Sequence, residues 1–209
     1  MQDRRFEWMA LIAGAIAFLC LVWLAAKVTV GGTLRFDQTV RAAVHSVASP
    51  GLTLLLQGVT RLGSQAVVIS IAVFAALVLF RQGRTDCALM ILIVMGGAEL
   101  LESTIKLQFH RQRPEPFFDT PLPPSYSFPS GHALLSFCCY GTLAAVADVR
   151  GALRWLLRAA SVALILLIGI SRVYLGVHYP TDVIAGYLTG AVWLAGVAIL
   201  YKRLVAIET

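Results

Sequence analysis

The sequence predicts an all-α membrane protein, a bundle of six transmembrane helices with short amphipathic helices in the outer loops. Hydrophobic residues make up 58% of the 209 residues and charged residues only 13%, about half the charged share of an ordinary soluble domain. The apolar residues form long runs of membrane-spanning length. Polar residues gather in three clusters at the ends of these runs. We therefore expect one integral membrane domain over residues 1–209.

Each expected span is an apolar run close to the roughly 20 residues that a bilayer requires. Arg4 and Arg5 precede the first run and would also suit a signal peptide, but the run is long for one and Lys27 follows it, which favours a retained span. The second and fourth runs are short. The spans cover about residues 8–26, 65–80, 87–105, 132–146, 155–174 and 183–201.

The segment between the first two spans, residues 31–63, has apolar residues at helical spacing on both sides of a Ser49-Pro50 break. It predicts two short amphipathic helices. Such helices either lie at the membrane interface or pack across the bundle, and the sequence favours neither arrangement.

The basic residues indicate the orientation of the chain. The net charge of +6 could suggest nucleic acid, but the basic residues are scattered between apolar runs, so we exclude a nucleic-acid partner. Once the cations of the polar clusters are set aside, Lys and Arg favour a cytoplasmic location for both termini. All three clusters then fall on the opposite, outer side, where they can form one site. The sequence leaves the oligomeric state open.

One cluster places His178 four residues before Asp182, near the start of the last span. This spacing suits a hydrogen bond between imidazole and carboxylate, which fixes the tautomer and leaves the second ring nitrogen free. His178 is therefore a candidate nucleophile and Asp182 its orienting group. The alternative is a helix-capping Asp182 beside an interfacial histidine.

A second cluster, Pro129-Ser130-Gly131-His132, stands immediately before an apolar helix. A Ser-Gly turn at a helix N-terminus exposes backbone N–H groups and the positive end of the helix dipole, which together bind anions. His132 in the first turn could protonate a leaving oxygen. The alternative is an ordinary N-cap serine followed by a permissive glycine.

The remaining polar residues supply positive charge. Arg113 and Arg172 are candidate clamps for phosphate oxygens, and Lys106 supplies a third cation. We expect Glu102 to orient Lys106 through an ion pair one helical turn away. A basic rim over lipid head groups would explain His110 and Arg111, which we leave outside the site.

These motifs resemble the tripartite signature of the type 2 phosphatidic acid phosphatase superfamily. The matching strings are Lys106-x6-Arg113-Pro114, Pro129-Ser130-Gly131-His132 and Ser171-Arg172-x5-His178-x3-Asp182. Every defining position is present and in order. The six expected spans are similar to the membrane branch of that family.

The resemblance implies a metal-independent phosphatase without a cofactor, acting through a phosphohistidine. It implies that His178 attacks phosphorus, that Asp182 orients it and that His132 protonates the leaving group and then activates water. The phosphoryl oxygens would be held by Lys106, Arg113, Ser130, Gly131 and Arg172.

The short chain resembles the bacterial members of the family, which implies a location in the cytoplasmic (inner) membrane with the site on its periplasmic side. The implied substrate is undecaprenyl diphosphate or a glycerophospholipid phosphate, such as phosphatidic acid or phosphatidylglycerol phosphate. The alternatives are a lipid A phosphatase and a lipid-to-lipid phosphotransferase. A vanadate-dependent haloperoxidase or a non-catalytic lipid transporter is a remote alternative, given the hydrophobicity of the chain and its intact motifs.

Overall fold

The regular secondary structure of the described residues is entirely helical. The computed structural model describes residues 2–118 and 122–207, and within these ranges it contains eight helices and no strand. The helices are α1 (Gln2–Thr29), α2 (Leu34–His45), α3 (Pro50–Leu62), α4 (Gln65–Arg81), α5 (Thr85–Phe109), α6 (Gly131–Val146), α7 (Gly151–Tyr174) and α8 (Pro180–Ile207).

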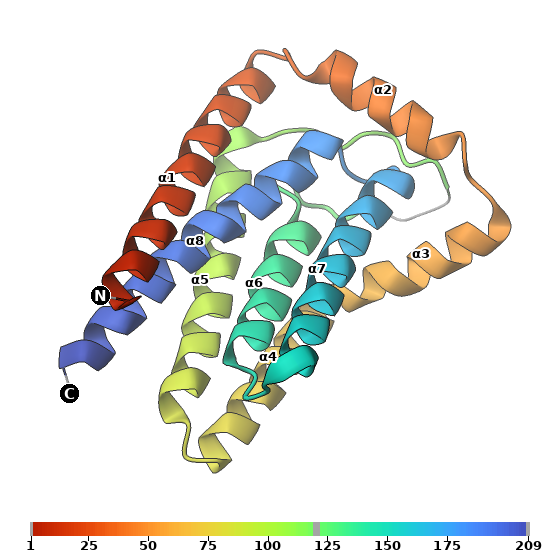
Figure 1. Ribbon diagram of the computed structural model, residues 1–209. Helices are drawn as coiled ribbons and strands as arrows, with labels where there is room; N and C mark the ends of the chain where they lie inside the picture. The colour runs from red at the N-terminus through yellow and green to blue at the C-terminus, as the bar shows by residue number, and fades with distance from the viewer. Residues whose placement is uncertain (1, 119–121, 208–209) are drawn as a thin grey trace.

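Six of these helices run along the length of the bundle in alternating directions. Figure 1 shows α1, α5 and α7 running one way and α4, α6 and α8 running the other, so that both ends of the chain lie at the same end of the bundle. Helix α1 packs along α8, while α6 is surrounded by α5, α7 and α8. The segments that carry the three polar clusters meet at the other end (Figure 1).

Four of the described helices are long and apolar enough to cross a membrane: Glu7–Thr29 within α1, α5, α7 and Pro180–Lys202 within α8. Helices α4 and α6 are apolar but shorter than that requirement, as their sequences indicated. Helices α2 and α3 are long and apolar enough only when they are taken together, and they are bent by 120° at the break between them. Counted as one broken span, they would make a fifth. The all-α class is therefore confirmed, and the number of six spans stays a prediction.

The core lies where α4, α5, α6 and α8 meet, and small residues allow these helices to approach closely. Ala72, Ala76 and Ala98 are almost completely buried there. Gly97 gives room to the indole of Trp193, which a Cβ atom would meet at 2.1 Å. The Trp193 indole N–H donates to the Val94 carbonyl at 2.8 Å. Close packing through small residues is the usual basis of helix association in membranes.

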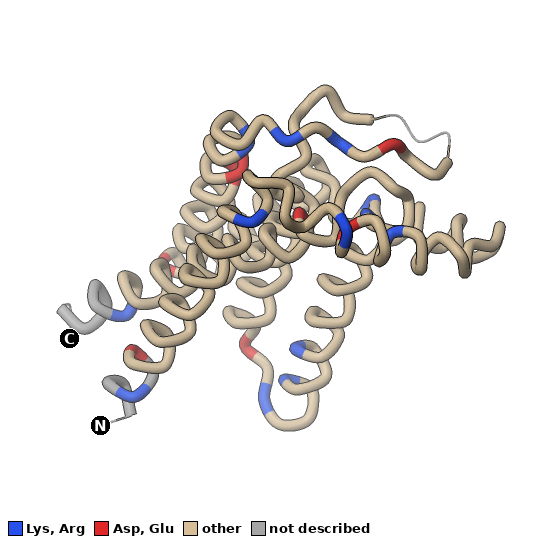
Figure 2. The backbone as a smooth tube through the Cα atoms, turned by 90° about the horizontal axis from the view of Figure 1, so that it is seen from above, with Lys and Arg blue, Asp and Glu red and all other residues tan. Residues whose placement is uncertain are grey.

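The outer surface of the bundle is apolar along its middle. Large hydrophobic side chains such as Ile12, Leu19 and Trp23 on α1 are more than half exposed. Figure 2 shows Lys, Arg, Asp and Glu gathered toward the helix ends, with long uncharged stretches between them. A surface of this kind suits contact with lipid.

Helices α2 and α3 form an arm across the end of the bundle opposite the two termini (Figure 1). The Ser49 side chain caps α3 by accepting from the Leu52 N–H group at 3.4 Å, and Pro50 occupies the first turn. The buried Tyr174 hydroxyl at the end of α7 bonds to Thr53 Oγ1 at 2.7 Å. The two expected amphipathic helices are therefore present, and α3 packs against α7.

Candidate active site

A cavity of about 150 Å³ at the end of the bundle opposite the two termini brings the three sequence clusters together. The loop after α5, the N-terminus of α6, the end of α7 and the loop before α8 all contribute to its wall. The predicted site residues that line it are Glu102, Lys106, Arg113, Gly131, His132, Arg172 and His178, whereas Ser130 and Asp182 lie behind this lining. Residues separated by about seventy positions in the chain therefore share one chamber.

His178 and Asp182 lie in the predicted relation to each other. His178 Nδ1 is 3.4 Å from Asp182 Oδ2, and both side chains are almost completely buried. Ser127 stands beside them: its hydroxyl donates to Asp182 Oδ2 at 2.5 Å and lies 3.5 Å from His178 Nδ1. Asp182 is more than a helix cap, because its carboxylate faces the imidazole.

The second ring nitrogen of His178 is identified as an acceptor by Arg113. Arg113 Nη1 lies 2.9 Å from His178 Nε2, and a guanidinium can only donate. The proton of the neutral ring therefore sits on Nδ1, toward Asp182. The lone pair on Nε2 faces Arg113, and both residues line the cavity. This is the tautomer that a nucleophilic Nε2 requires.

Burial keeps His178 neutral. Burial lowers the pKa of His178 well below its usual value near 6.5, and the neighbouring cations Arg113, Arg172 and Lys106 lower it further. The imidazole lone pair is consequently available at neutral pH. A nucleophile that had to lose a proton first would have no such advantage.

The N-terminus of α6 forms one wall of the cavity. Ser130 is the N-cap residue, yet its side chain makes no capping hydrogen bond, and its buried hydroxyl oxygen has no protein partner. The Ser130 N–H donates to the Asp182 carbonyl at 2.9 Å, which holds α6 against the start of α8. A buried hydroxyl left free beside a helix N-terminus is suited to an anion.

Gly131 is required by its neighbours. A Cβ atom at this position would lie 2.2 Å from Oε1 of Glu102. Glu102 Oε1 accepts from Lys106 Nζ at 2.6 Å, so the expected ion pair one turn apart on α5 is present. Lys106 also reaches Ser125 Oγ at 3.3 Å. The glycine thus allows the Glu102–Lys106 pair to approach the α6 N-terminus.

Arg172 enters the cavity from the end of α7 and is only 6% exposed. Its Nη1 donates to Thr60 Oγ1 of α3 at 2.8 Å, whereas its buried Nε has no protein partner. A buried guanidinium with a free donor at the wall of a cavity is suited to a ligand that completes its hydrogen bonding. Arg172 and Ser130 therefore both point to an anion site.

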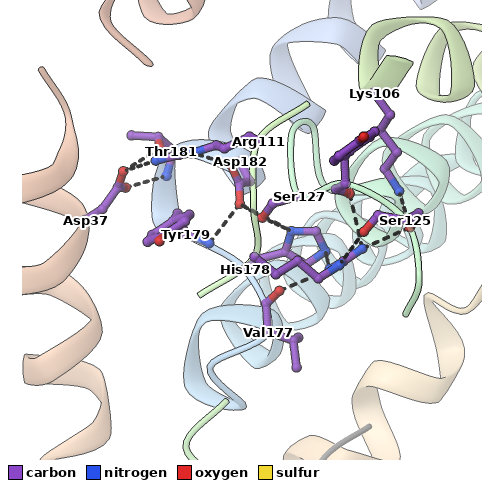
Figure 3. A network of polar contacts seen from close by, with 12 residues as sticks. Asp37, Lys106, Arg111, Ser125, Ser127, Val177, His178, Tyr179, Thr181 and Asp182 are labelled. Atoms are coloured by element: carbon purple, nitrogen blue, oxygen red, sulfur yellow. Dashed lines mark hydrogen bonds and ion pairs between the residues drawn. The ribbon is translucent and has the colours of Figure 1, made fainter. Parts of the chain in front are cut away.

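One sequence prediction is wrong. Arg111 does not belong to a basic rim over lipid head groups: its side chain is 11% exposed and makes ion pairs with Asp37 and Asp182 (Figure 3). The sequence holds no signal for this, because Asp37 comes from α2, 74 positions earlier. Ser127 was also missed, since a lone serine carries no pattern. His110, by contrast, is exposed.

A second cavity of about 430 Å³ adjoins the first on the side of α4 and α5. The two cavities share Gln65, Glu102, Lys106 and Ser125. Leu107, at the rim of the second cavity, is 64% exposed on the apolar surface of α5. The polar chamber therefore adjoins a wider space that borders the lipid-facing surface.

No metal centre is evident among the described residues. Within 2–118 and 122–207, no group of three or more His, Cys, Asp or Glu side chains lies close enough together to hold a metal ion. The metal-free chemistry stays a prediction.

The fold and the site together define a class of protein, a helical membrane protein with a histidine- and arginine-lined anion site at one end of its bundle. The chain belongs to the PAP2 superfamily, whose model matches residues 87–206. It is 31% identical to phosphatidylglycerophosphatase B of Bacillus subtilis (strain 168) over 179 residues, covering 83% of this chain and 87% of that protein. Family membership makes the chain a phosphatase.

Two further comparisons agree with the family. The chain is 33% identical over 130 residues to an undecaprenyl-diphosphatase of Sulfolobus acidocaldarius, covering 60% of this chain and 59% of that protein. The crystal structure of a transmembrane PAP2-type phosphatidylglycerolphosphate phosphatase from Bacillus subtilis superposes with a TM-score of 0.83. The sequence identity is 28%, and the match covers 91% of this chain and 96% of that one.

Proposed function

We propose that the protein hydrolyses a lipid phosphate or diphosphate at the outer face of a bacterial cytoplasmic membrane, through a phosphohistidine on His178. One observation carries the proposal. The cavity beside His178 Nε2 is lined by three cations, and one of them, Arg172, has a buried Nε without a protein partner. Ser130, which immediately precedes Gly131 of the lining, has a buried hydroxyl that also lacks a protein partner. Free donors converging on a small chamber are the binding pattern of a phosphoryl group.

In the first half-reaction the lone pair of His178 Nε2 attacks phosphorus. The bond from phosphorus to the lipid oxygen breaks as the bond from phosphorus to nitrogen forms. Asp182 holds the Nδ1–H of His178 and stabilises the charge that develops on the ring. The negative charge of the bound phosphate favours protonation of His132, which then donates this proton to the departing oxygen.

The phosphoryl oxygens need compensating charge in this step. Lys106, Arg113 and Arg172 supply it, with hydrogen bonds from Ser130 Oγ and from the N–H groups at the start of α6. Arg113 contacts His178 Nε2 and would turn to a phosphoryl oxygen when substrate binds.

In the second half-reaction water attacks the phosphohistidine. His132, now neutral, takes a proton from the water, and the bond from phosphorus to Nε2 breaks. Inorganic phosphate leaves and His178 is restored as the neutral ring. No metal ion enters either step.

The substrate class follows from the position of the cavity beside an apolar surface. We take phosphatidylglycerol phosphate as the first substrate to test, since the relative with 87% coverage is named for that activity, and undecaprenyl diphosphate as the second. Six crossings with cytoplasmic termini would place the site at the periplasmic head-group level.

The test is phosphate release by the purified protein in detergent, with and without a chelator, from four lipids: phosphatidylglycerol phosphate, undecaprenyl diphosphate, phosphatidic acid and lipid A. We expect chelator-insensitive release from at least one. Release that needs no added lipid acceptor argues against a phosphotransferase.

The mechanism is tested by a pair of variants. His178→Gln should remove turnover and the acid-labile phosphoenzyme formed from ³²P-labelled substrate. His132→Gln should slow both half-reactions while the phosphoenzyme still forms. Near-normal turnover by His178→Gln in a folded protein would contradict the mechanism.

A further inference from the structure

The two carboxylate oxygens of Asp182 have different partners. Oδ2 faces His178 and accepts from the Ser127 hydroxyl at 2.5 Å and from the Tyr179 N–H at 2.9 Å. Oδ1 points the other way and accepts from Arg111 Nη1 at 2.5 Å. One oxygen serves the catalytic imidazole, and the other is occupied by a cation outside the phosphate cavity.

Arg111 is fixed on both edges and on one face. Its Nη2 donates to Asp37 Oδ2 at 2.7 Å, while Nη1 reaches both Asp182 and Thr181 Oγ1. The guanidinium carbon lies 4.1 Å from the centre of the Tyr179 ring. Only a planar fork can bridge two carboxylates in this way, because a lysine ammonium is a single point charge.

Asp37 completes the chain of contacts from the peripheral helix α2. Its side chain is fully buried. Oδ1 accepts from the Thr181 N–H at 3.0 Å, and Oδ2 accepts from Thr181 Oγ1 at 2.8 Å as well as from Arg111. Figure 3 shows the continuous line from Asp37 through Arg111 and Asp182 to His178. The carboxylate of α2 is therefore linked to the nucleophile through one arginine.

We propose that Asp37 and Arg111 are positioning residues for the reaction, an inference that rests on the proposed role of His178. Asp37 holds the guanidinium of Arg111 in its plane, and Arg111 holds Oδ1 of Asp182. Oδ2 is thereby kept on the Nδ1–H of His178, so that Nε2 retains its lone pair. Arg111 also compensates the charge of Asp182, which would be costly to bury alone.

If Asp37 and Arg111 had a purely structural role, they would only attach α2 to the start of α8. Their loss would then lower the stability of the protein and leave its turnover unchanged. If they are positioning residues, their loss slows the attack by His178. The rate of phosphoenzyme formation separates the two roles, and so does substitution by a residue that keeps the charge but loses the fork.

The first experiment compares Arg111→Lys, Arg111→Met and Asp37→Asn with wild type by rapid-quench phosphorylation and steady-state kinetics. We expect kcat to fall ~10- to 100-fold for Arg111→Lys, the factor for one lost charge-assisted hydrogen bond, and further for Arg111→Met. KM should stay within about twofold, because neither residue lines the phosphate cavity.

Tyr174→Phe is the matched control. It removes the buried hydroxyl that bonds to Thr53 and fastens the α2–α3 arm to α7, but it does not touch Asp182. This variant should lose thermal stability and keep its kcat. An equal fall in kcat for Tyr174→Phe and Asp37→Asn would show that both variants act only by loosening the α2–α3 arm, and it would overturn the proposal.

The pH profile of kcat distinguishes the two positioning residues. The charged or titratable groups around Asp182 are Arg111 and His178 in contact, with Asp37, Arg41, Arg113 and Tyr179 beyond or beside them. Arg111→Met removes the cation that stabilises ionised Asp182, so the acid limb of kcat should move to higher pH. Asp37→Asn leaves that cation in place, so its loss of activity should be the same at every pH.

A double variant tests whether Asp37 acts through Arg111. Asp37→Asn combined with Arg111→Met should be no slower than Arg111→Met alone. Independent, multiplicative losses would contradict the relay, as would normal turnover of Arg111→Lys. If wild type itself forms no phosphohistidine, the proposed function fails. If wild type forms it and the Arg111 variants form it equally fast, only this inference fails.

Discussion

At Gly131 the start of α6 packs directly against the Glu102 carboxylate of α5. The substitution Gly131→Ala tests whether the site requires this close packing. The added Cβ would displace the Glu102 carboxylate and with it Lys106. Overpacking of this kind costs ~1–3 kcal/mol, so we expect kcat/KM to fall ~10- to 100-fold. The fall in kcat/KM is measured from the kinetics of phosphate release.

Gly96→Ala on α5, the helix that carries Glu102 and Lys106, is the control for Gly131→Ala. No atom lies within 4 Å of a Cβ at Gly96, so activity should persist and stability should rise by up to ~1 kcal/mol. Equal activity of the Gly131→Ala and Gly96→Ala proteins would mean that the Glu102–Lys106 pair does not serve the site.

His178 also predicts how stability depends on pH. Its pKa is lowered in the folded protein by burial and by neighbouring cations, so the ring stays neutral below pH 6.5, where the unfolded chain binds a proton. Stability from this residue is therefore complete above pH 6.5 and falls as pH drops, by up to ~1.4 kcal/mol per unit.

Thermal unfolding of wild type and His178→Gln between pH 7.5 and 5 checks this dependence. Wild type should lose more of its Tm than the variant over that interval. Parallel losses in the two proteins would show that the pKa of His178 is the same in the folded and unfolded chain, and that burial does not keep the ring neutral.

The sequence predicted the local contacts among the candidate site residues well and their contacts with distant segments poorly. His178, Asp182 and Glu102–Lys106 were predictable because each pair lies one helical turn apart, so local geometry determines the contact. The Arg111 contacts join segments 71 and 74 positions apart. No local periodicity encodes such a meeting, and a basic residue beside an apolar helix looks like any interfacial arginine.

Among the elements, α3 contributes directly to the site through Thr60. The Thr60 hydroxyl accepts from Arg172, whose Nε already lacks a protein partner. We expect Thr60→Val to leave the guanidinium less well held and to lower kcat/KM ~10-fold. Substrate-dependence curves measured in mixed micelles give the value.

Thr53→Val on the same helix provides the comparison. Thr53 bonds to the Tyr174 hydroxyl and the Ser49 carbonyl and does not contact Arg172. Its loss should lower Tm and leave kcat/KM unchanged. Unchanged kcat/KM in Thr60→Val as well as in Thr53→Val would assign α3 a purely structural role.

The helices themselves were predictable because length and apolarity decide them, yet their ends were not. The expected first span ended at residue 26, whereas α1 continues to Thr29; α8 begins at Pro180 instead of 183. Polar residues can continue a helix beyond the apolar run, so hydropathy underestimates its length. The amphipathic pattern of residues 31–63 predicted α2 and α3 but not their 120° bend.

At the scale of the whole molecule, alternating helix directions predict which loops share a side of the membrane. The turn after α4, near Gln82, and the turn after α6, near Asp148, lie at the end that holds both termini (Figure 1). Gln112 lies in the loop after α5, beside the site.

Labelling with a membrane-impermeant maleimide in intact cells tests this arrangement. Gln112→Cys should be labelled from outside, and Gln82→Cys and Asp148→Cys only after lysis, with the parent chain as the background for its own cysteines. Labelling of Gln82→Cys in intact cells would show that the short helix α4 does not cross, and the prediction of six spans would be wrong.

The second cavity, which opens beside Leu107 on the lipid-facing side of α5, has a kinetic consequence. We expect a substrate to reach the site by diffusing sideways within the leaflet. The encounter is then a search in two dimensions, and the quantity that governs saturation is the mole fraction of substrate among neighbouring lipids. Diluting the surface with inert detergent at constant bulk substrate should slow the enzyme, whereas diluting the whole suspension should not.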